Sequence, residues 1–360
     1  MEQFSCKTQI VSGPGAISVL GKLGAKRLFL VTDPYFMGSG QAEKVAQATR
    51  CTHVEIFDKV VPDPGVELAA EGTARLKAFA PDLLVGLGGG SALDCCKAIG
   101  YFGKGSYKVA AIPTTSGSGS EVTDFAILTH NKVKHPLVDE RLRPDLAILD
   151  SDFLQELPKS LIADTGFDVL CHAVEAYGAK NAGSMTDLLA REAFSIAFAA
   201  LPASFAGRKE VRLKVHTAST MAGLAFTQAG LGLCHAMAHS LGGLFHVPHG
   251  RLNAILLPAV ISCNAGAAGK KYAQLARAAG LGGSADTIAV RNLRNGLIRL
   301  RRELNLPETL AQAGIAPRTV WANVEEIVRS ALADPCCETN PLPAEEFLIR
   351  RILEEVTGRG

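Results

Sequence analysis

The sequence is poor in aromatic residues and carries almost no excess of charge. Of its 360 residues 6% are aromatic, one is a tryptophan, and 37 basic residues against 35 acidic ones give a net charge of +2. Short basic runs such as residues 299–302 are more typical of a solvated helix face than of a nucleic-acid site. We therefore expect no nucleic-acid partner.

The sequence also lacks the hydrophobic runs that mark a membrane span or a signal peptide. We find no apolar stretch long enough to span a membrane and no signal-peptide-like stretch at the start. This predicts a cytoplasmic protein without a membrane partner. The nine cysteines are odd in number and show no CxxC spacing, which favours reduced thiols in a reducing compartment.

The length fits two domains, and the hydrophobic pattern changes near residue 158. Before that point, short runs typical of buried strands alternate with helical segments, which predicts a mainly parallel sheet covered on both faces. Beyond it only long helical patterns remain. We predict an α/β domain at 1–158 and an all-α domain at 159–360. The expected strands are residues 27–32, 53–57, 83–87, 109–112 and 146–149, and the expected helices include 40–49, 66–79, 91–101, 184–201, 211–229 and 293–304.

Histidines gather in the stretch 232–250, GLCHAMAHSLGGLFHVPHG. His235 and His239 are four residues apart, so on a helix both rings project from one face. His249 stands between a proline and a glycine, where a bend can aim its ring back at that face. The stretch also contains His246.

A second pair with the same spacing, Asp168 and His172, lies in TGFDVLCHAVEAY. Either pair alone is often only a pair of polar helix residues. Both stand in apolar surroundings, however, where uncompensated imidazoles and a carboxylate are costly to bury. A divalent transition metal removes that cost. We predict a metal held by Asp168, His172 and two of the later histidines.

Three features of the first half suggest a nucleotide site. Glycines at 86–90 end a strand where a helix begins, so they either cradle a phosphate or simply turn the chain, and they do not match GxGxxG. The stretch 111–123, AIPTTSGSGSEVT, follows another strand and is either a second ligand loop or a flexible one. Asp33 ends the strand RLFLVTD, where it could accept the ribose hydroxyls of NAD or open a turn.

Taken together, these motifs resemble the iron-containing, or group III, alcohol dehydrogenase family. The resemblance covers nearly the whole chain and includes, in order, VTD at 31–33, GGGSALD at 88–94, IPTTSGSGSEVT at 112–123, TGFDVLCHAVEAY at 165–177 and GLGLCHAMAHSLGGLFHVPHG at 230–250. Within the family, the last motif is most similar to the short 1-propanol or ethanol dehydrogenases of bacterial microcompartments.

The resemblance implies a Rossmann-like NAD-binding α/β domain, an all-helical metal-binding and substrate domain, and an active site in the cleft between them. The ligands of Fe2+, or of Zn2+ as in some relatives, would be Asp168, His172, His235 and His249. His239 would lie near the substrate and handle a proton. The residues implied for the cofactor are Asp33, Gly88, Gly89, Gly90, Ser91, Asp94, Thr114, Thr115, Ser118 and Lys134.

The activity implied is reversible hydride transfer between NAD(H) and a short primary alcohol or aldehyde. Alternatives are a glycerol or polyol dehydrogenase, a dehydroquinate-synthase-like lyase of the same fold, or a metal-binding scaffold without catalysis. A homodimer, residence in a microcompartment, and the enzymes or shell of that microcompartment as partners are further expectations from the resemblance.

Overall fold

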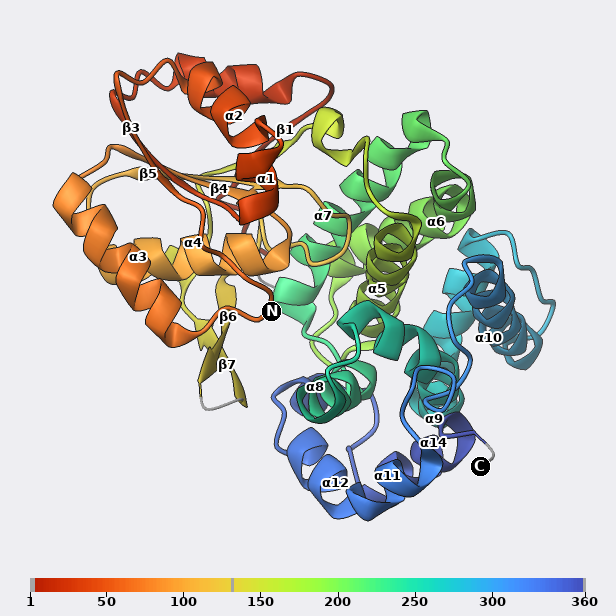
Figure 1. Cartoon of the computed structure of the whole chain (residues 1–360). Coiled ribbons are helices and arrows are strands. Elements are labelled where there is room, and N and C mark those ends of the chain that lie inside the picture. Colours follow the sequence, from red (N-terminus) through yellow and green to blue (C-terminus); the bar gives the residue numbers. More distant parts are fainter. Residues whose placement is uncertain (1–3, 131–132, 359–360) are drawn as a thin grey trace. The chain divides into compact units, whose positions relative to one another are not determined.

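The computed structural model describes residues 4–130 and 133–358, without the side chains of residues 133 and 134. It divides into a unit at Ser5–Leu157 and a second unit that begins at Pro158. The first unit is built on a sheet and the second on helices (Figure 1). The predicted fold class, an α/β domain followed by a helical one, is confirmed.

A six-stranded, all-parallel sheet forms the centre of the first unit. The strand order is β1-β8-β5-β4-β2-β3, so the chain crosses from one half of the sheet to the other between β1 and β2 and returns between β4 and β5. The strands are β1 (Gln9–Ser12), β2 (Arg27–Val31), β3 (His53–Phe57), β4 (Leu83–Gly88), β5 (Lys108–Pro113) and β8 (Leu146–Leu149). The sequence predicted all of these except β1.

Both faces of this sheet are covered, because apolar residues occupy successive positions of its strands. In β2, Leu28 and Leu30 join a core that includes residues of α1 and α2, whereas Phe29 and Val31 join a second core that includes residues of α3 and α4. This is the pattern of a strand buried on both sides. The helices and short 3-10 segments of the unit are η1 (Ala16–Lys22), α1 (Pro34–Gly38), α2 (Gln41–Thr49), α3 (Val66–Phe79), α4 (Gly90–Gly103), η2 (Glu140–Leu142) and η3 (Ser151–Leu154).

An antiparallel hairpin, β6 (Phe125–His130) and β7 (Val133–Val138), stands apart from this sheet. This hairpin was not predicted from the sequence, because only Ala126 and Leu128 of β6 are buried and β7 contains Pro136, a residue rare inside strands.

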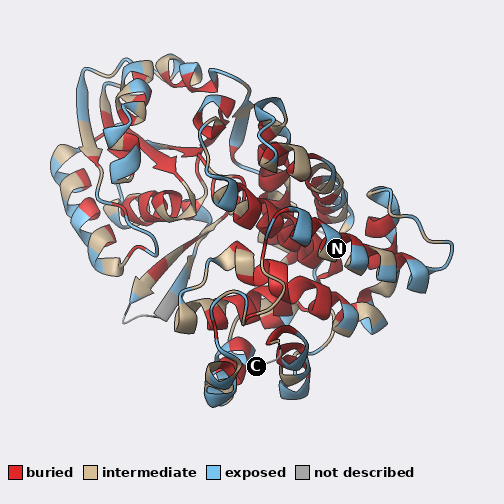
Figure 2. Ribbon diagram, turned by 45° about the vertical axis from the view of Figure 1, so that its right-hand side comes forward, coloured by how far each residue is buried: buried red, intermediate tan, exposed pale blue. Residues whose placement is uncertain are grey.

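The second unit contains no strand among residues 158–358. Its helices are α5 (Lys159–Gly178), α6 (Ser184–Phe205), α7 (Arg212–Ala229), α8 (Leu233–Phe245), α9 (His249–Ala278), α10 (Asp286–Glu303), α11 (Pro317–Ala322), α12 (Val324–Leu332), α13 (Cys336–Thr339) and α14 (Glu346–Val356), with a 3-10 turn η4 (Lys209–Val211). Figure 2 shows buried residues concentrated in the inner helices of this unit and along the strands of the other.

Helix α5 is the buried centre of the helical unit and packs against α6, α7 and α9. Every residue from Gly166 to Gly178 is buried. Two glycines allow this close packing: a Cβ at Gly166 would meet Leu201 at 2.3 Å, and one at Gly250 would meet the Asp164 carbonyl oxygen at 2.0 Å. Polar residues on α5 are therefore in the interior and need partners there.

Helix α9 runs for 30 residues although it contains Pro258. Because proline has no N–H, it leaves the carbonyl of Ala254, one turn earlier, without its helical donor. The buried guanidinium of Arg301 on α10 donates to this carbonyl, with Nη1 3.2 Å from the Ala254 oxygen. A side chain of a neighbouring helix thus replaces the missing backbone hydrogen bond.

Helices α6 and α9 are long and apolar enough to cross a membrane by length and composition, against the sequence-based expectation that no such stretch exists. The apolar window of α9 is 67% buried inside the protein, as the core helix of a globular domain also is.

Candidate metal centre

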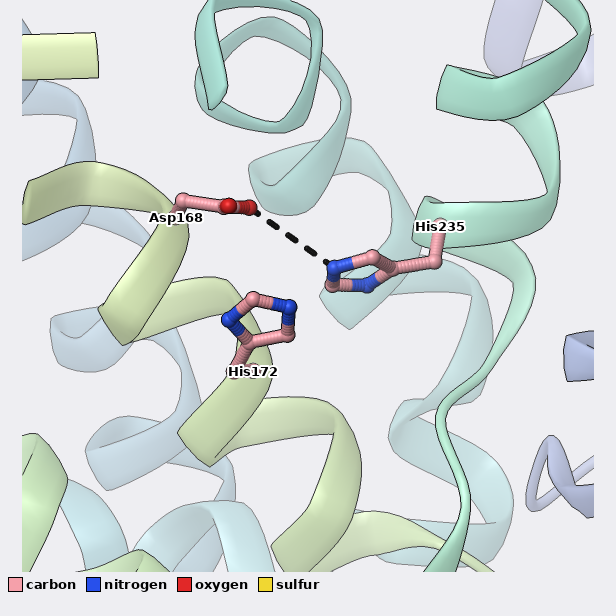
Figure 3. Close-up of side chains that lie close together, drawn as sticks. All are labelled: Asp168, His172 and His235. Carbon is pink, nitrogen blue, oxygen red and sulfur yellow. Dashed lines mark ion pairs between the residues drawn. The ribbon is translucent and has the colours of Figure 1, made fainter. Parts of the chain in front are cut away.

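Helix α5 supplies the first two predicted ligands. Asp168 and His172 lie one turn apart, both buried, and the His172 ring stacks on Phe226 with centroids 4.4 Å apart. Figure 3 shows the Asp168 carboxylate and the rings of His172 and His235 converging from two helices. One donor atom from each of these three residues lies within 4.8 Å of the others.

His235 lies in the first turn of α8, and a residue of α5 fixes that turn. The Glu175 carboxylate accepts hydrogen bonds from the backbone N–H groups of Cys234 (2.7 Å) and His235 (3.2 Å). These are helix N-terminal amides that have no acceptor within their own helix. Glu175 Oε2 also lies 2.6 Å from His235 Nδ1. This contact directs the other ring nitrogen, Nε2, toward Asp168.

The distances between donor atoms fit a shared metal ion. His235 Nε2 and His249 Nε2 each lie 3.7 Å from Asp168 Oδ1. Two donors bound to one tetrahedral ion at about 2.1 Å lie roughly 3.4 Å apart, whereas a direct hydrogen bond is shorter by about 0.5 Å. The residues therefore fit a divalent metal: donor atoms of Asp168, His172 and His235 lie within 4.8 Å of one another, and His249 Nε2, which is outside that group, lies against the same Asp168 carboxylate oxygen.

Asn253 was not singled out from the sequence, although it follows His249 by one turn on α9. Its Nδ2 lies 2.7 Å from Asp168 Oδ1, 3.1 Å from His249 Nε2 and 3.3 Å from His235 Nε2. The side chain is fully buried. Asn253 thus donates to Asp168 and lies against two of the candidate histidine ligands, and its i, i+4 spacing from His249 was the signal available in the sequence.

The electrostatics of the cluster are those of a cation site. Burial raises the pKa of Asp168, but the rings of His172, His249 and His235 outweigh burial and hold that pKa well below its usual range. For His235, burial lowers the pKa, but the nearby carboxylates of Asp168 and Glu175 raise it overall to about 9. Burial keeps the pKa of His249 well below its usual value. The two carboxylates thus favour a positive charge at His235.

His239 projects from the next turn of α8 and has a different partner. Its Nδ1 lies 2.8 Å from Asp334 Oδ2, which is a hydrogen-bond distance and too short for two ligands of one ion. Its ring stacks on that of His249 at 5.1 Å between centroids. His246 is exposed at the end of α8 with a positive φ of 54°, in the left-handed conformation that ends helices.

The cofactor candidates of the first unit gather at the carboxyl edge of its sheet. Gly88 ends β4 with a φ of 147°, and a Cβ there would meet the Ala92 Cβ at 2.6 Å. Gly89 is the N-cap residue of α4, and a Cβ added there would lie 3.3 Å from Oγ1 of Thr115, which is in the loop that follows β5. Asp33 caps α1 by accepting from the N–H groups of Tyr35 and Phe36. Of the remaining candidates, Gly90 and Ser91 begin α4, and Thr114 and Ser118 lie in the loop after β5.

Asp94 and Lys134 are the two remaining cofactor candidates. The Asp94 carboxylate is buried and accepts hydrogen bonds from Ser120 Oγ at 2.5 Å and from the Ile127 N–H at 3.0 Å. It thereby anchors the hydroxyl-rich loop after β5. Lys134 lies in β7, and its side chain is outside the described part of the chain.

The chain is similar to known proteins over nearly its whole length. Residues 7–151 match the model of the iron-containing alcohol dehydrogenases, and residues 162–357 match that of the C-terminal region of the Fe-containing alcohol dehydrogenase family. The chain is 40% identical to 1-propanol dehydrogenase PduQ of Citrobacter freundii over 99% of this chain and 100% of that protein. It is 34% identical to an NADPH-dependent butanol dehydrogenase of Clostridium saccharobutylicum, covering 98% and 97% of the two chains.

Among solved structures, a 1,3-propanediol oxidoreductase has a TM-score of 0.93 at 33% identity and covers 98% of this chain and 99% of its own. A parallel-sheet unit followed by a helical unit with a buried aspartate–histidine cluster therefore defines an oxidoreductase that acts on alcohols. The chain belongs to the iron-containing alcohol dehydrogenase family.

Proposed function

We propose that this alcohol dehydrogenase interconverts short primary alcohols and their aldehydes with NAD(H) and a divalent metal, in the first place iron. The observation that carries the proposal is the buried cluster in which His235 Nε2 and His249 Nε2 each lie 3.7 Å from Asp168 Oδ1. The similarity to a 1-propanol dehydrogenase supports a short primary alcohol as substrate.

Asp168, His172, His235 and His249 would hold the metal. When bound, the metal supplies a Lewis acid for the substrate oxygen and the nicotinamide supplies or accepts the hydride. A set of one carboxylate and three imidazoles is compatible with Fe2+ and does not select zinc strongly. Burial raises the pKa of the nearby Cys234 thiol to about 11 and raises that of Cys171 well above its usual value, so both remain protonated and neither offers a thiolate.

The first unit would bind NAD at the carboxyl edge of its sheet. Residues 88–91 join β4 to the N-terminus of α4, where free amides and the helix dipole favour a diphosphate. Asp33 would accept hydrogen bonds from the ribose hydroxyls and repel the additional phosphate of NADP. Cofactor choice needs its own test, because one relative is described as NADPH-dependent.

His239 would carry the proton that leaves the alcohol hydroxyl or returns to the aldehyde oxygen. Its ring is adjacent to the candidate ligand His249, but its Nδ1 is paired with Asp334 and so is outside the proposed metal ligand set. The side chain is 26% exposed, which gives a proton a route to water.

The experiment that tests this function begins with the metal-free enzyme. The metal is removed and Fe2+ or Zn2+ is restored separately under anaerobic conditions, and oxidation of NADH is followed with acetaldehyde and with propionaldehyde. Turnover that returns with Fe2+ supports the proposal. Metal and NADH binding without turnover on either aldehyde would contradict it, and glycerol in the oxidative direction then tests the polyol alternative.

A matched pair of variants tests the ligand set. His249→Ala should lose the metal and turnover while NADH binding stays within about twofold, since its contacts lie in the helical unit. His246→Asn is the control, because His246 is exposed and asparagine tolerates its left-handed backbone. Full metal content in His249→Ala would refute the assignment. A homodimer and residence in a microcompartment remain predictions from the resemblance to the family.

A further inference from the structure

The loop between α12 and α13 supplies Asp334, a partly buried carboxylate that none of the sequence motifs included. Asp334 follows His239 by 95 residues in the chain, yet its Oδ2 lies 2.8 Å from His239 Nδ1. The side chain of Asp334 is 16% exposed. A contact of this length between a carboxylate and an imidazole fixes both the orientation and the tautomer of the ring.

Asp334 is itself held rigidly. Its Oδ1 accepts the backbone N–H of Cys336 at 2.9 Å, and its own carbonyl accepts the N–H of Cys337 at 3.0 Å. These bonds form a tight turn at the start of α13. The carboxylate therefore cannot follow the ring if the ring moves.

The same C-terminal segment braces α8 at two further points. The Ser240 hydroxyl donates to the carbonyl of Ile327 on α12 at 3.1 Å, and the Leu233 N–H donates to Asn340 Oδ1 at 3.0 Å. Residues 327–340 thus hold both the beginning of α8 and the turn next to His239. The position of His239 is determined by this segment as well as by its own helix.

A second metal site is the other interpretation of this cluster, because Cys336 also offers a donor atom within 4.8 Å of those of His239 and Asp334. The distance argues against it. Nδ1 and Oδ2 are 2.8 Å apart, whereas two ligands of one tetrahedral ion at about 2.1 Å would be roughly 3.4 Å apart. Burial also raises the pKa of the Cys336 thiol well above its usual value, which disfavours a thiolate ligand.

We infer that Asp334 is a positioning residue that holds His239 with its proton on Nδ1, so that Nε2 on the opposite edge of the ring is the atom that exchanges a proton with the substrate. This inference rests on the proposed function of His239. The His249 ring, stacked on His239 with an interplanar angle of 16°, limits the remaining rotation.

The experiment compares Asp334→Asn in two backgrounds of the metal-loaded enzyme. In the wild-type background we expect kcat to fall about 10- to 100-fold with KM within about threefold, because a positioned proton carrier contributes about 10²- to 10⁴-fold. In the His239→Ala background the same substitution should change kcat by less than about twofold, since Asp334 acts through that ring. Glu338→Gln, which removes an exposed carboxylate four residues away, is the matched control.

Equal losses in the two backgrounds, or loss of the metal in Asp334→Asn, would overturn the inference. The second measurement is independent of turnover and of the variant's folding: ¹⁵N spectra of histidine-labelled, zinc-loaded wild-type enzyme, with His239 assigned through His239→Asn. A proton on Nδ1 of His239 supports the inference, and a proton on Nε2 contradicts it. If the wild-type enzyme reduces no aldehyde, the proposed function fails, while the spectra still decide how Asp334 pairs with His239.

Discussion

Glu175 connects two helices of the metal centre through a single side chain. Its carboxylate accepts two backbone N–H groups at the start of α8 and also contacts His235 Nδ1 at 2.6 Å. It is 4% exposed, so these bonds are made in the absence of competing water. A residue outside the ligand set thus determines which nitrogen of His235 faces Asp168.

We expect Glu175→Gln to weaken metal binding by about 10- to 100-fold, because partners that orient ligand histidines typically contribute that much. Metal affinity can be measured by competition with a chromogenic chelator. Glu326→Gln, at an exposed position of α12, is the control and should leave affinity unchanged. Unaltered affinity in Glu175→Gln would show that α8 alone orients His235.

The charge on His235 gives a prediction about pH. In the metal-free protein its pKa is about 9, so near pH 7.5 the ring carries a proton that metal binding at Nε2 must displace. Metal affinity should therefore rise about tenfold per pH unit up to about pH 9 and then level off. Calorimetry in buffers of different ionisation enthalpy should detect about one proton released, and no release would contradict the prediction.

The raised pKa of His235 also makes the free energy of unfolding of the metal-free protein depend on pH. A pKa raised above its ordinary value of 6.5 means that the folded metal-free protein binds this proton more tightly than the unfolded chain does. This contribution is fully present below about pH 6.5 and is lost as pH rises through about 9. The metal-loaded protein, which lacks the proton, should not share this loss.

At the scale of elements, a side chain of α10 supplies a hydrogen bond that α9 lacks because of Pro258. Arg301→Ala removes the donor to the Ala254 carbonyl opposite Pro258 and leaves a buried acceptor. We expect a loss of about 2–4 kcal/mol in the free energy of unfolding, measured with urea on the metal-free protein. Arg302→Ala, an exposed neighbour that pairs with Glu308, should lose less than about 1 kcal/mol. Similar losses in the two variants would refute a special role for Arg301.

The turn between β4 and α4 gives a second prediction at this scale. Gly88→Ala places a Cβ on a backbone with a φ of 147° and within 2.6 Å of the Ala92 Cβ. We expect NADH binding, followed by fluorescence titration, to weaken at least about tenfold because the turn must shift. Gly38→Ala meets no atom within 4 Å and serves as the control. Metal content should stay normal in both variants, and loss of metal would indicate general unfolding.

At the scale of the molecule, the cofactor candidates lie in the unit at Ser5–Leu157, and the candidate metal ligands lie in the unit that begins at Pro158. Metal at about 100 times its dissociation constant should stabilise the folded state by about 2.7 kcal/mol. Hydrogen exchange should show this protection in α5, α8 and α9 of the helical unit and little of it in the strands of the sheet. Equal protection of both units would show that they unfold as one.

A structural feature could be predicted from the sequence when the interactions that form it join residues close together in the chain. Strands such as β2 and helices such as α3 depend on hydrophobic periodicity within the element, which the sequence displays directly. The edge strand β1 is mostly exposed and the hairpin strand β7 contains Pro136, so their hydrophobic pattern does not distinguish them from loops. Candidate ligands were found because pairs spaced by four residues are also local signals.

The sequence by itself determined the two-unit fold, the family, and the group of histidines and aspartate from which a metal site would be built. Only the tertiary structure decided which polar groups meet in space. Glu175 reaches His235 across 60 residues, and Asp334 reaches His239 across 95. Helix packing brings such pairs together, and no periodicity along the chain records it. The distances of 3.7 Å and 2.8 Å then separate a site for a cation from a hydrogen bond, because two ligands of one ion stand farther apart than a donor and its acceptor.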